Sequence, residues 1–99
     1  GAAPPALTDL VADLQKRGQL TDSLVLRALA GGDLPFFEQA VAQLAGVSLS
    51  NARLLIHDPG KRGLTAIYQR CRLPQDFFRM TEAVIDMARG FDFLRGAPE

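Results

Sequence analysis

Apolar residues recur along this chain at the spacing of amphipathic helices. The first such segment has apolar residues at i, i+3, i+4 and i+7, namely Leu7, Leu10, Val11 and Leu14. The same spacing recurs further along and predicts helices at about 8–17, 21–30, 34–45, 49–57, 64–71 and 74–90. No segment alternates apolar and polar residues for long enough to be a strand. The pattern therefore predicts an all-α fold, a compact orthogonal bundle of about six short helices.

The residues between these segments are those that start and stop helices. Thr21 and Ser48 have hydroxyl groups that can cap the second and fourth helices, and Asp33 or Leu34 is expected to cap the third. Gly46 suits the left-handed position that follows the third helix. These residues divide the chain where the apolar pattern is interrupted, which supports the assignment of separate short helices.

The length of 99 residues suits one domain, and 47% apolar with 22% charged residues is typical of a globular chain. We expect a flexible lead-in or cloning remnant at 1–7, a single helical domain at 8–90 and a tail at 91–99, with Gly90 weakening or ending the last helix. A single cysteine permits no internal disulfide, which suits a reducing cytoplasm. Neither a signal peptide nor a run of about 18 apolar residues is visible, so no membrane association is expected.

The net charge of zero hides an uneven distribution. Residues 51–73 hold five basic groups and one acidic group, a local charge of +4, whereas the segments on either side each carry −2. Such a segment indicates an acidic partner or a polyanion, or a face that is merely solvated. Backbone N–H groups near Lys61 and Arg62 could hold a phosphate, although a polar interhelical loop explains the same residues. The candidate residues for binding a partner or polyanion are Arg53, His57, Lys61, Arg62, Arg70 and Arg72.

The segment 41–57 has the pattern of a helix-turn-helix. With Gly46 as the turn glycine, the positions that the motif requires to be apolar are all apolar: Val41, Ala42, Ala45, Val47, Ala52 and Leu55. The side chains that would face DNA are Ser48, Ser50, Asn51 and Arg53. Leu54 is a poor base reader, and the run 54–56 predicts a second helix that is buried on more than one side. Any αα-corner needs a glycine, small residues and a cap, so DNA binding is the alternative interpretation.

No residue pattern typical of catalysis is present. His57 is the only histidine and has no metal-ligand spacing around it, so neither a metal nor a cofactor is expected. We expect His57 to lie at a helix end near the last carbonyl groups. Cys71 lies on an apolar stripe, which predicts a buried small side chain rather than a nucleophile. Tyr68 shares that stripe and is expected to bury its ring while its hydroxyl reaches an edge.

Several short motifs between residues 18 and 74 resemble a known bacterial family, the domain of unknown function 2336. The motifs are Leu-Arg-Ala-Leu at 26–29, Gly-Asp-Leu-Pro-Phe-Phe at 32–37, Leu-Ala-Gly-Val at 44–47, His-Asp-x-Gly at 57–60 and Gly-Leu-x-Ala-x-Tyr at 63–68. The resemblance implies a largely helical, cytoplasmic protein of alphaproteobacteria with no established activity. Many members are longer, so it also implies a C-terminal helical piece of a longer chain. It assigns no catalytic or binding residues.

These features together predict a non-enzymatic helical module that binds a protein partner or itself in the bacterial cytoplasm. The apolar residues of the tail are further candidate docking groups, namely Phe91, Phe93 and Leu94. The alternative is a helix-turn-helix domain that binds DNA through residues 41–57, in which case nucleic acid is the partner.

Overall fold

The computed structural model describes the backbone of residues 5–96 and the side chains of residues 7–90. This part of the chain consists of α1 (Pro5–Lys16), α2 (Asp22–Ala30), α3 (Leu34–Ala45), α4 (Leu49–Ile56), α5 (Arg62–Arg70), the short 3₁₀-helix η1 (Gln75–Phe77) and α6 (Phe78–Gly96). It contains no strand, so the predicted all-α fold is confirmed. Within the same residues, no helix combines the length and apolar character needed to cross a membrane.

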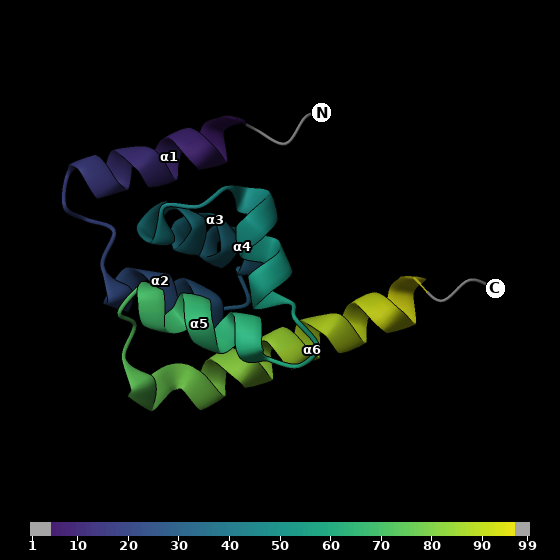
Figure 1. Cartoon of the computed structure of the whole chain (residues 1–99). Helices are drawn as coiled ribbons and strands as arrows, with labels where there is room; N and C mark the ends of the chain where they lie inside the picture. Colours follow the sequence, from purple (N-terminus) through teal and green to yellow (C-terminus); the bar gives the residue numbers. More distant parts are fainter. Residues whose placement is uncertain (1–4, 97–99) are drawn as a thin grey trace.

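Helix α3 forms the centre of the bundle, with α1 and α2 on either side of it (Figure 1). It also contacts α4 and α5. Its side chains are apolar around most of the helix, and Phe37, Ala40 and Val41 are fully buried. A helix that is apolar on nearly every side is stable only where other helices cover it. The sequence of α3 thus explains why the remaining helices are arranged around it.

The predicted helix caps are confirmed. The hydroxyl of Thr21 accepts a hydrogen bond from the backbone N–H of Leu24 at 3.2 Å, and that of Ser48 accepts one from Asn51 at 3.1 Å. Asp33, rather than Leu34, caps α3 through its carboxylate. Each cap satisfies an N–H group that has no partner within its own helix. Local side-chain chemistry therefore determines where these three helices begin.

Both terminal helices are longer than the apolar pattern predicts. Helix α1 begins at Pro5, and residues 1–4 of the expected lead-in lie outside the described residues. Helix α6 continues through Gly90 to Gly96, so the expectation that Gly90 ends it is wrong. A glycine costs an established helix about 1 kcal/mol, which does not stop a helix of this length from continuing. The backbone of residues 91–96, assigned to a tail above, is consequently helical.

Helices α5 and α6 are joined around Tyr68. The ring of Tyr68 is buried and meets that of Phe78 edge to face, with centroids 5.0 Å apart. Its hydroxyl donates a hydrogen bond to the backbone oxygen of Pro74 at 2.5 Å, and burial raises the pKa of this hydroxyl. The prediction that the ring of Tyr68 is buried is therefore confirmed, and the hydrogen bond to Pro74 is an addition that the sequence did not predict. This contact fixes the turn that carries η1 and positions α6 beside α2.

Candidate functional site

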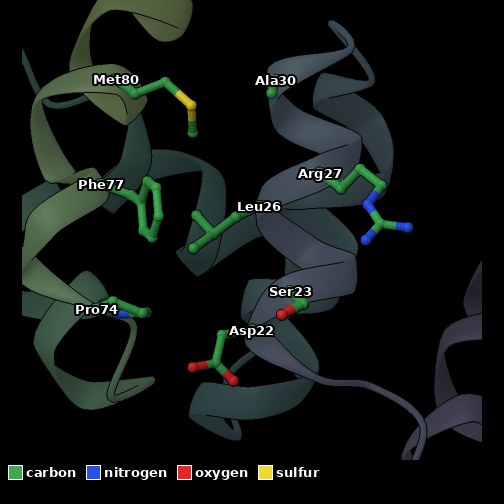
Figure 2. Close-up of a pocket in the computed structure, with 8 residues that line it drawn as sticks. All are labelled: Asp22, Ser23, Leu26, Arg27, Ala30, Pro74, Phe77 and Met80. Carbon is green, nitrogen blue, oxygen red and sulfur yellow. The ribbon is translucent and has the colours of Figure 1, made fainter.

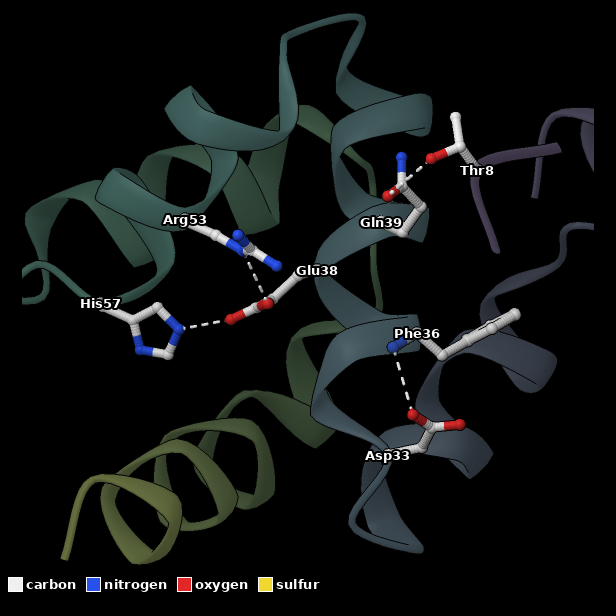
Figure 3. Close-up of polar contacts among 7 residues, drawn as sticks. All are labelled: Thr8, Asp33, Phe36, Glu38, Gln39, Arg53 and His57. Atoms are coloured by element: carbon white, nitrogen blue, oxygen red, sulfur yellow. Dashed lines mark hydrogen bonds and ion pairs between the residues drawn. The ribbon is translucent and has the colours of Figure 1, made fainter. Parts of the chain in front are cut away.

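Two of the candidate basic residues are drawn together by a carboxylate on a neighbouring helix. Arg53 and His57 lie one turn apart on the α4 side, and both point towards Glu38 of α3 (Figure 3). The Nε atom of Arg53 is 3.1 Å from one carboxylate oxygen, and the Nε2 atom of His57 is 2.6 Å from the other. We call these three residues the Glu38 cluster. It connects α3 to α4 through both oxygens of one carboxylate.

Glu38 is the residue of this cluster that the sequence analysis missed. It is only 7% exposed, and a buried carboxylate is costly unless it has charged or hydrogen-bonding partners. One signal was available, because Glu38 follows Phe36-Phe37 on a helix that is otherwise nearly all apolar. A charged residue in such a position requires a partner. The basic residues of α4 supply it, so their presence is explained by the fold.

Lys61 is also paired within the domain. Its ammonium group lies 2.9 Å from a carboxylate oxygen of Asp86 and 3.7 Å from one of Glu82, both on α6. The hydrogen bond with Asp86 is the main reason that the pKa of Lys61 is raised. Arg89 adds a second link, because its guanidinium donates a hydrogen bond to the backbone oxygen of His57 at 3.2 Å. The loop between α4 and α5 is thus held against α6.

The loop between α4 and α5 contains a carboxylate, that of Asp58. Asp58 accepts hydrogen bonds from the backbone N–H groups of Gly63 at 2.8 Å and Gly60 at 3.2 Å. These two bonds lower the pKa of the Asp58 carboxyl. A phosphate at this position would have to displace Asp58 from the same N–H groups. The phosphate interpretation of this loop is therefore weakened, and the structural interpretation explains its Asp and Gly residues.

Gly63 has a further role at this loop. A Cβ atom added at Gly63 would lie 2.7 Å from the backbone oxygen of Leu55 and 2.9 Å from its Cα atom. Backbone atoms cannot give way as a flexible side chain can, so only glycine lets α5 approach the end of α4 this closely. The His-Asp-x-Gly and Gly-Leu motifs around the loop are consequently explained by packing and capping.

The remaining basic candidates do not form one patch with these. Arg62 and Arg70 lie at opposite ends of α5, which at 1.5 Å per residue are about 12 Å apart. The Nε atom of Arg70 donates a hydrogen bond to the backbone oxygen of Ala45 at 2.7 Å, at the end of α3. Arg72 is exposed beyond the end of α5. Of the six predicted residues, the structure brings only Arg53 and His57 into one cluster.

The α3–α4 corner has the local geometry of a helix-turn-helix. Gly46 is left-handed with φ 73°, and Ala42 and Ala52 are buried, as close contact between the two helices requires. The predicted DNA-facing residues are all exposed, namely Ser48, Ser50, Asn51 and Arg53. The prediction that α4 is buried on more than one side is wrong, because Leu54 is 72% exposed while Ile56 is buried. Only one face of α4 meets the rest of the bundle.

A different surface, between α2 and the start of α6, has an apolar floor. Figure 2 shows Leu26 facing Phe77 across a groove of about 300 Å³, with Asp22 at one end. We call it the α2–α6 groove; it is lined by Asp22, Ser23, Leu26, Arg27, Ala30, Pro74, Phe77 and Met80. Phe77 is 47% exposed although it is aromatic. Neither this groove nor Phe77 was predicted as a site, because the groove exists only once α2 and η1 lie side by side.

A further exposed apolar side chain lies in α6 beyond the groove. Met80 lines the groove, and Met87, two turns further on, is 61% exposed. Phe91, Phe93 and Leu94 belong to the helical backbone beyond Met87, but their side chains lie outside the described residues. The predicted docking role of these three residues therefore stays a prediction.

The single cysteine is poorly suited to nucleophilic chemistry. Burial raises the pKa of the Cys71 thiol to about 11, so the thiolate is scarce at neutral pH. Its sulfur atom lies 3.5 Å from the backbone oxygen of Val41 on α3. Among the residues with described side chains, no three His, Cys, Asp or Glu residues come close enough to hold a metal ion.

These observations define a small all-helical domain in which one face has its charges paired and another exposes apolar side chains. The chain belongs to the bacterial family described as an uncharacterised protein conserved in bacteria, the domain of unknown function 2336, whose model matches residues 2–97. The predicted membership is confirmed, over more of the chain than the quoted motifs cover. Neither a curated protein nor a solved structure matches the chain.

Proposed function

We propose that this domain is a non-enzymatic interaction module of a cytoplasmic bacterial protein, which binds a protein partner or a second copy of itself. The observation that supports it is the apolar surface formed by the α2–α6 groove and by Met87. Phe77 lines the groove and Met87 lies ten residues further along the chain in α6; both are large and about half exposed or more. Apolar surfaces of this kind are typical of contact sites between proteins.

The chemistry of these side chains suits protein binding. Aromatic residues contribute strongly to the binding energy of interfaces, and methionine adapts its flexible side chain to a partner. The groove also has charged residues at its edge, Asp22 and Arg27, which would orient a bound segment. An apolar centre with a polar rim is the usual organisation of an interface.

The contacts of His57 and Cys71, the two side chains most often used as a base or a nucleophile, support the non-enzymatic part of the proposal. His57 is held against Glu38, and Cys71 has a raised pKa and packs against α3. Both groups have structural roles that account for their positions. The basic residues named above likewise have partners within the domain in most cases, so they do not form the proposed binding surface by themselves.

The test compares two exposed apolar positions, Phe77 in the α2–α6 groove and Leu54 on α4. The tagged chain, its Phe77→Glu variant and its Leu54→Glu variant are each used to capture proteins from a bacterium that carries the domain. We expect at least one protein, or untagged copies of the chain, to bind the wild type and Leu54→Glu but not Phe77→Glu. Rebinding of the purified partner then gives the affinity. The proposal fails if nothing bound depends on Phe77 and the chain does not self-associate.

DNA binding through the α3–α4 corner is the second candidate, and the exposure of Ser50, Asn51 and Arg53 favours it. Against it, Arg53 is the only Lys or Arg within 48–57, and its guanidinium is paired with Glu38. DNA affinity depends largely on cations that contact phosphates. An amide NMR titration with a generic duplex tests this. Shifts confined to 48–62 that fade with added salt would support DNA binding, and no shifts at low salt would reject it.

A further inference from the structure

We propose that the α2–α6 groove binds a segment of another protein that presents a large apolar side chain and, close to it, a lysine or arginine. The apolar side chain lies between Leu26 and Phe77, and the cation lies against the carboxylate of Asp22. This inference rests on the proposed function and deepens it, because it states the chemistry by which the partner is recognised.

The groove is apolar along most of its length and acidic at one end. Figure 2 shows Met80 at one end, Leu26 facing Phe77 in the middle, and Asp22 at the other end. An apolar cavity of about 150 Å³ holds one benzene molecule. The groove has a volume of about 300 Å³, so it has room for one large apolar side chain and part of its neighbour.

A second carboxylate lies at the same end of the groove. The backbone oxygen of Pro74, which lines this end, accepts a hydrogen bond from the hydroxyl of Tyr68. Burial is the main reason that the pKa of this hydroxyl is raised, and the negative charges of Asp22 and Asp76 raise it further. A carboxylate has this effect only from nearby. Both carboxylates therefore lie near the Tyr68 hydroxyl, at the Pro74 end of the groove.

Neither carboxylate has a cation against it in the part of the chain that the structure describes. Asp22 and Asp76 are both exposed, and the ion pairs among residues with described side chains include neither of them. Arg27 also lines the groove, but Figure 2 shows its guanidinium pointing away from Phe77. The acidic end is thus open to a cation of a partner, and opposite charges across an interface give specificity.

The positions of Leu26 and Asp22 set the spacing of the groups on the partner. They are four residues apart on α2, which at 1.5 Å per residue is about 6 Å along the helix. A helical partner spans this distance with an apolar residue and a cation four positions apart. An extended partner spans about the same distance with two positions, at about 3.3 Å per residue. The proposal therefore predicts a sequence signature.

The shape of the groove favours another protein over a second copy of the chain. A groove is filled by a side chain that projects from the partner. In a two-fold pair each copy contributes the same surface, so a pair formed through the groove would place one groove against the other. Asp22 of one copy would then face the acidic end or the Met80 end of its partner. Neither end has a cation that points into the groove.

Selection from a peptide library tests the signature directly. Random twelve-residue peptides displayed on phage are selected on the immobilised full chain, with Phe77→Glu used for counter-selection. We expect the enriched peptides to share a large apolar residue with a lysine or arginine two or four positions away. An enriched peptide, made synthetically, should bind at least fivefold more weakly to Asp22→Lys, as measured by fluorescence anisotropy at low salt. Amide NMR spectra verify that each variant is folded.

Asp9→Lys is the matched control for the change in charge. Asp9 is exposed on α1, which lies across α3 from α2 (Figure 1), so this variant changes the net charge equally without altering the groove. It should keep the wild-type affinity. Replacing the cation of the peptide by glutamate should restore binding to Asp22→Lys, because the attraction is then reversed in sign on both sides.

The outcomes separate this inference from the proposed function. Enriched peptides that depend on Phe77 but share no cation would overturn the inference and leave an interaction module. Equal weakening by Asp9→Lys and Asp22→Lys would do the same, since net charge alone would explain it. A chain that enriches no peptide would also overturn the inference, and dimerisation through Phe77 in sedimentation velocity would still leave the module. A chain with neither a peptide nor a partner that depends on Phe77 would overturn both.

Discussion

Two surfaces of this domain differ in whether their side chains have partners within the fold. On the α3–α4 side, charged residues gather around a buried carboxylate, and the Glu38 cluster pairs them across two helices. On the α2–α6 side, Phe77 and Met87 leave much of their apolar surface in water. The comparison shows that the charged segment of the sequence mainly holds the fold together. The fold does not bury the exposed side chains of Phe77 and Met87, so packing within the domain does not explain them.

The largest effect expected on the charged side comes from replacing Gly63. Gly63→Ala should lower the free energy of unfolding by about 3 kcal/mol, because the new Cβ would clash with the backbone of Leu55. Gly60→Ala is the matched control, since a Cβ there would meet only an Asp58 oxygen at 3.9 Å. Urea unfolding of both variants measures the difference. Equal stability of the two would show that the close approach at Gly63 is not needed.

A pair of variants then tests the comparison directly. Glu38→Ala should cost about 2 kcal/mol of stability, since Arg53 and His57 lose charge-assisted hydrogen bonds but stay partly hydrated. It should leave the binding of an enriched peptide to the folded chain unchanged. Phe77→Glu should change stability by less than about 0.5 kcal/mol and abolish this binding. Unfolding curves and peptide titrations on the same samples measure both properties. The division between the surfaces is wrong if the two variants affect the same property.

The two adjacent basic residues of the loop should behave differently. Lys61→Glu should lower the melting temperature, because it replaces two ion pairs with α6 by repulsion from Asp86 and Glu82. Arg62→Glu should leave the melting temperature nearly unchanged, since Arg62 is exposed and forms no ion pair among the described residues. Thermal melts monitored by circular dichroism distinguish them. If Arg62→Glu abolishes partner binding without lowering the melting temperature, the loop is itself a binding surface.

The smallest expected effect is the loss of the stability that Asp58 contributes as the pH falls. The folded pKa of Asp58 is lowered from 3.8 by hydrogen bonds from Gly63 and Gly60, so this carboxylate stabilises the fold above pH 3.8. That stabilisation is lost as the pH falls below 3.8 towards the lower, folded pKa. Asp58→Asn should therefore be less stable than the wild type at pH 6, and the difference should shrink below pH 3.8. Melting temperatures measured from pH 2 to 7 give the curve; a constant difference would contradict it.

The features that the sequence predicted well are local ones. The caps at Thr21 and Ser48 and the left-handed Gly46 depend on residues within a few positions of each other. The partners of Glu38 are 15 and 19 residues away on another helix, so the periodicity of α3 could not reveal them. Charge counting pointed to Arg53, and the loop sequence pointed to His57, but both as members of a basic binding surface. Helical periodicity likewise found the apolar residues of α6 without showing which ones the core would leave exposed.

Leu54 is a second case in which helical periodicity did not predict burial, because the sequence predicted it buried and the structure exposes it. A run of three apolar residues predicted a helix covered on several sides, but α4 is short and only its Ala52–Ile56 face meets the bundle. The α2–α6 groove was missed because its walls come from segments about fifty residues apart in the sequence. A surface made by distant segments can be predicted only when the arrangement of the helices is known, and hydrophobic periodicity does not give that arrangement.

The contact between Cys71 and the oxygen of Val41 gives this domain an intrinsic reporter of its own motions. Burial raises the pKa of this thiol to about 11, so the thiol is almost entirely protonated at pH 7 while α5 packs against α3. An alkylating reagent will therefore act mainly on molecules in which these helices have separated, where the thiol regains its ordinary acidity. The labelling rate then measures how often the end of α5 separates from α3, in unmodified protein.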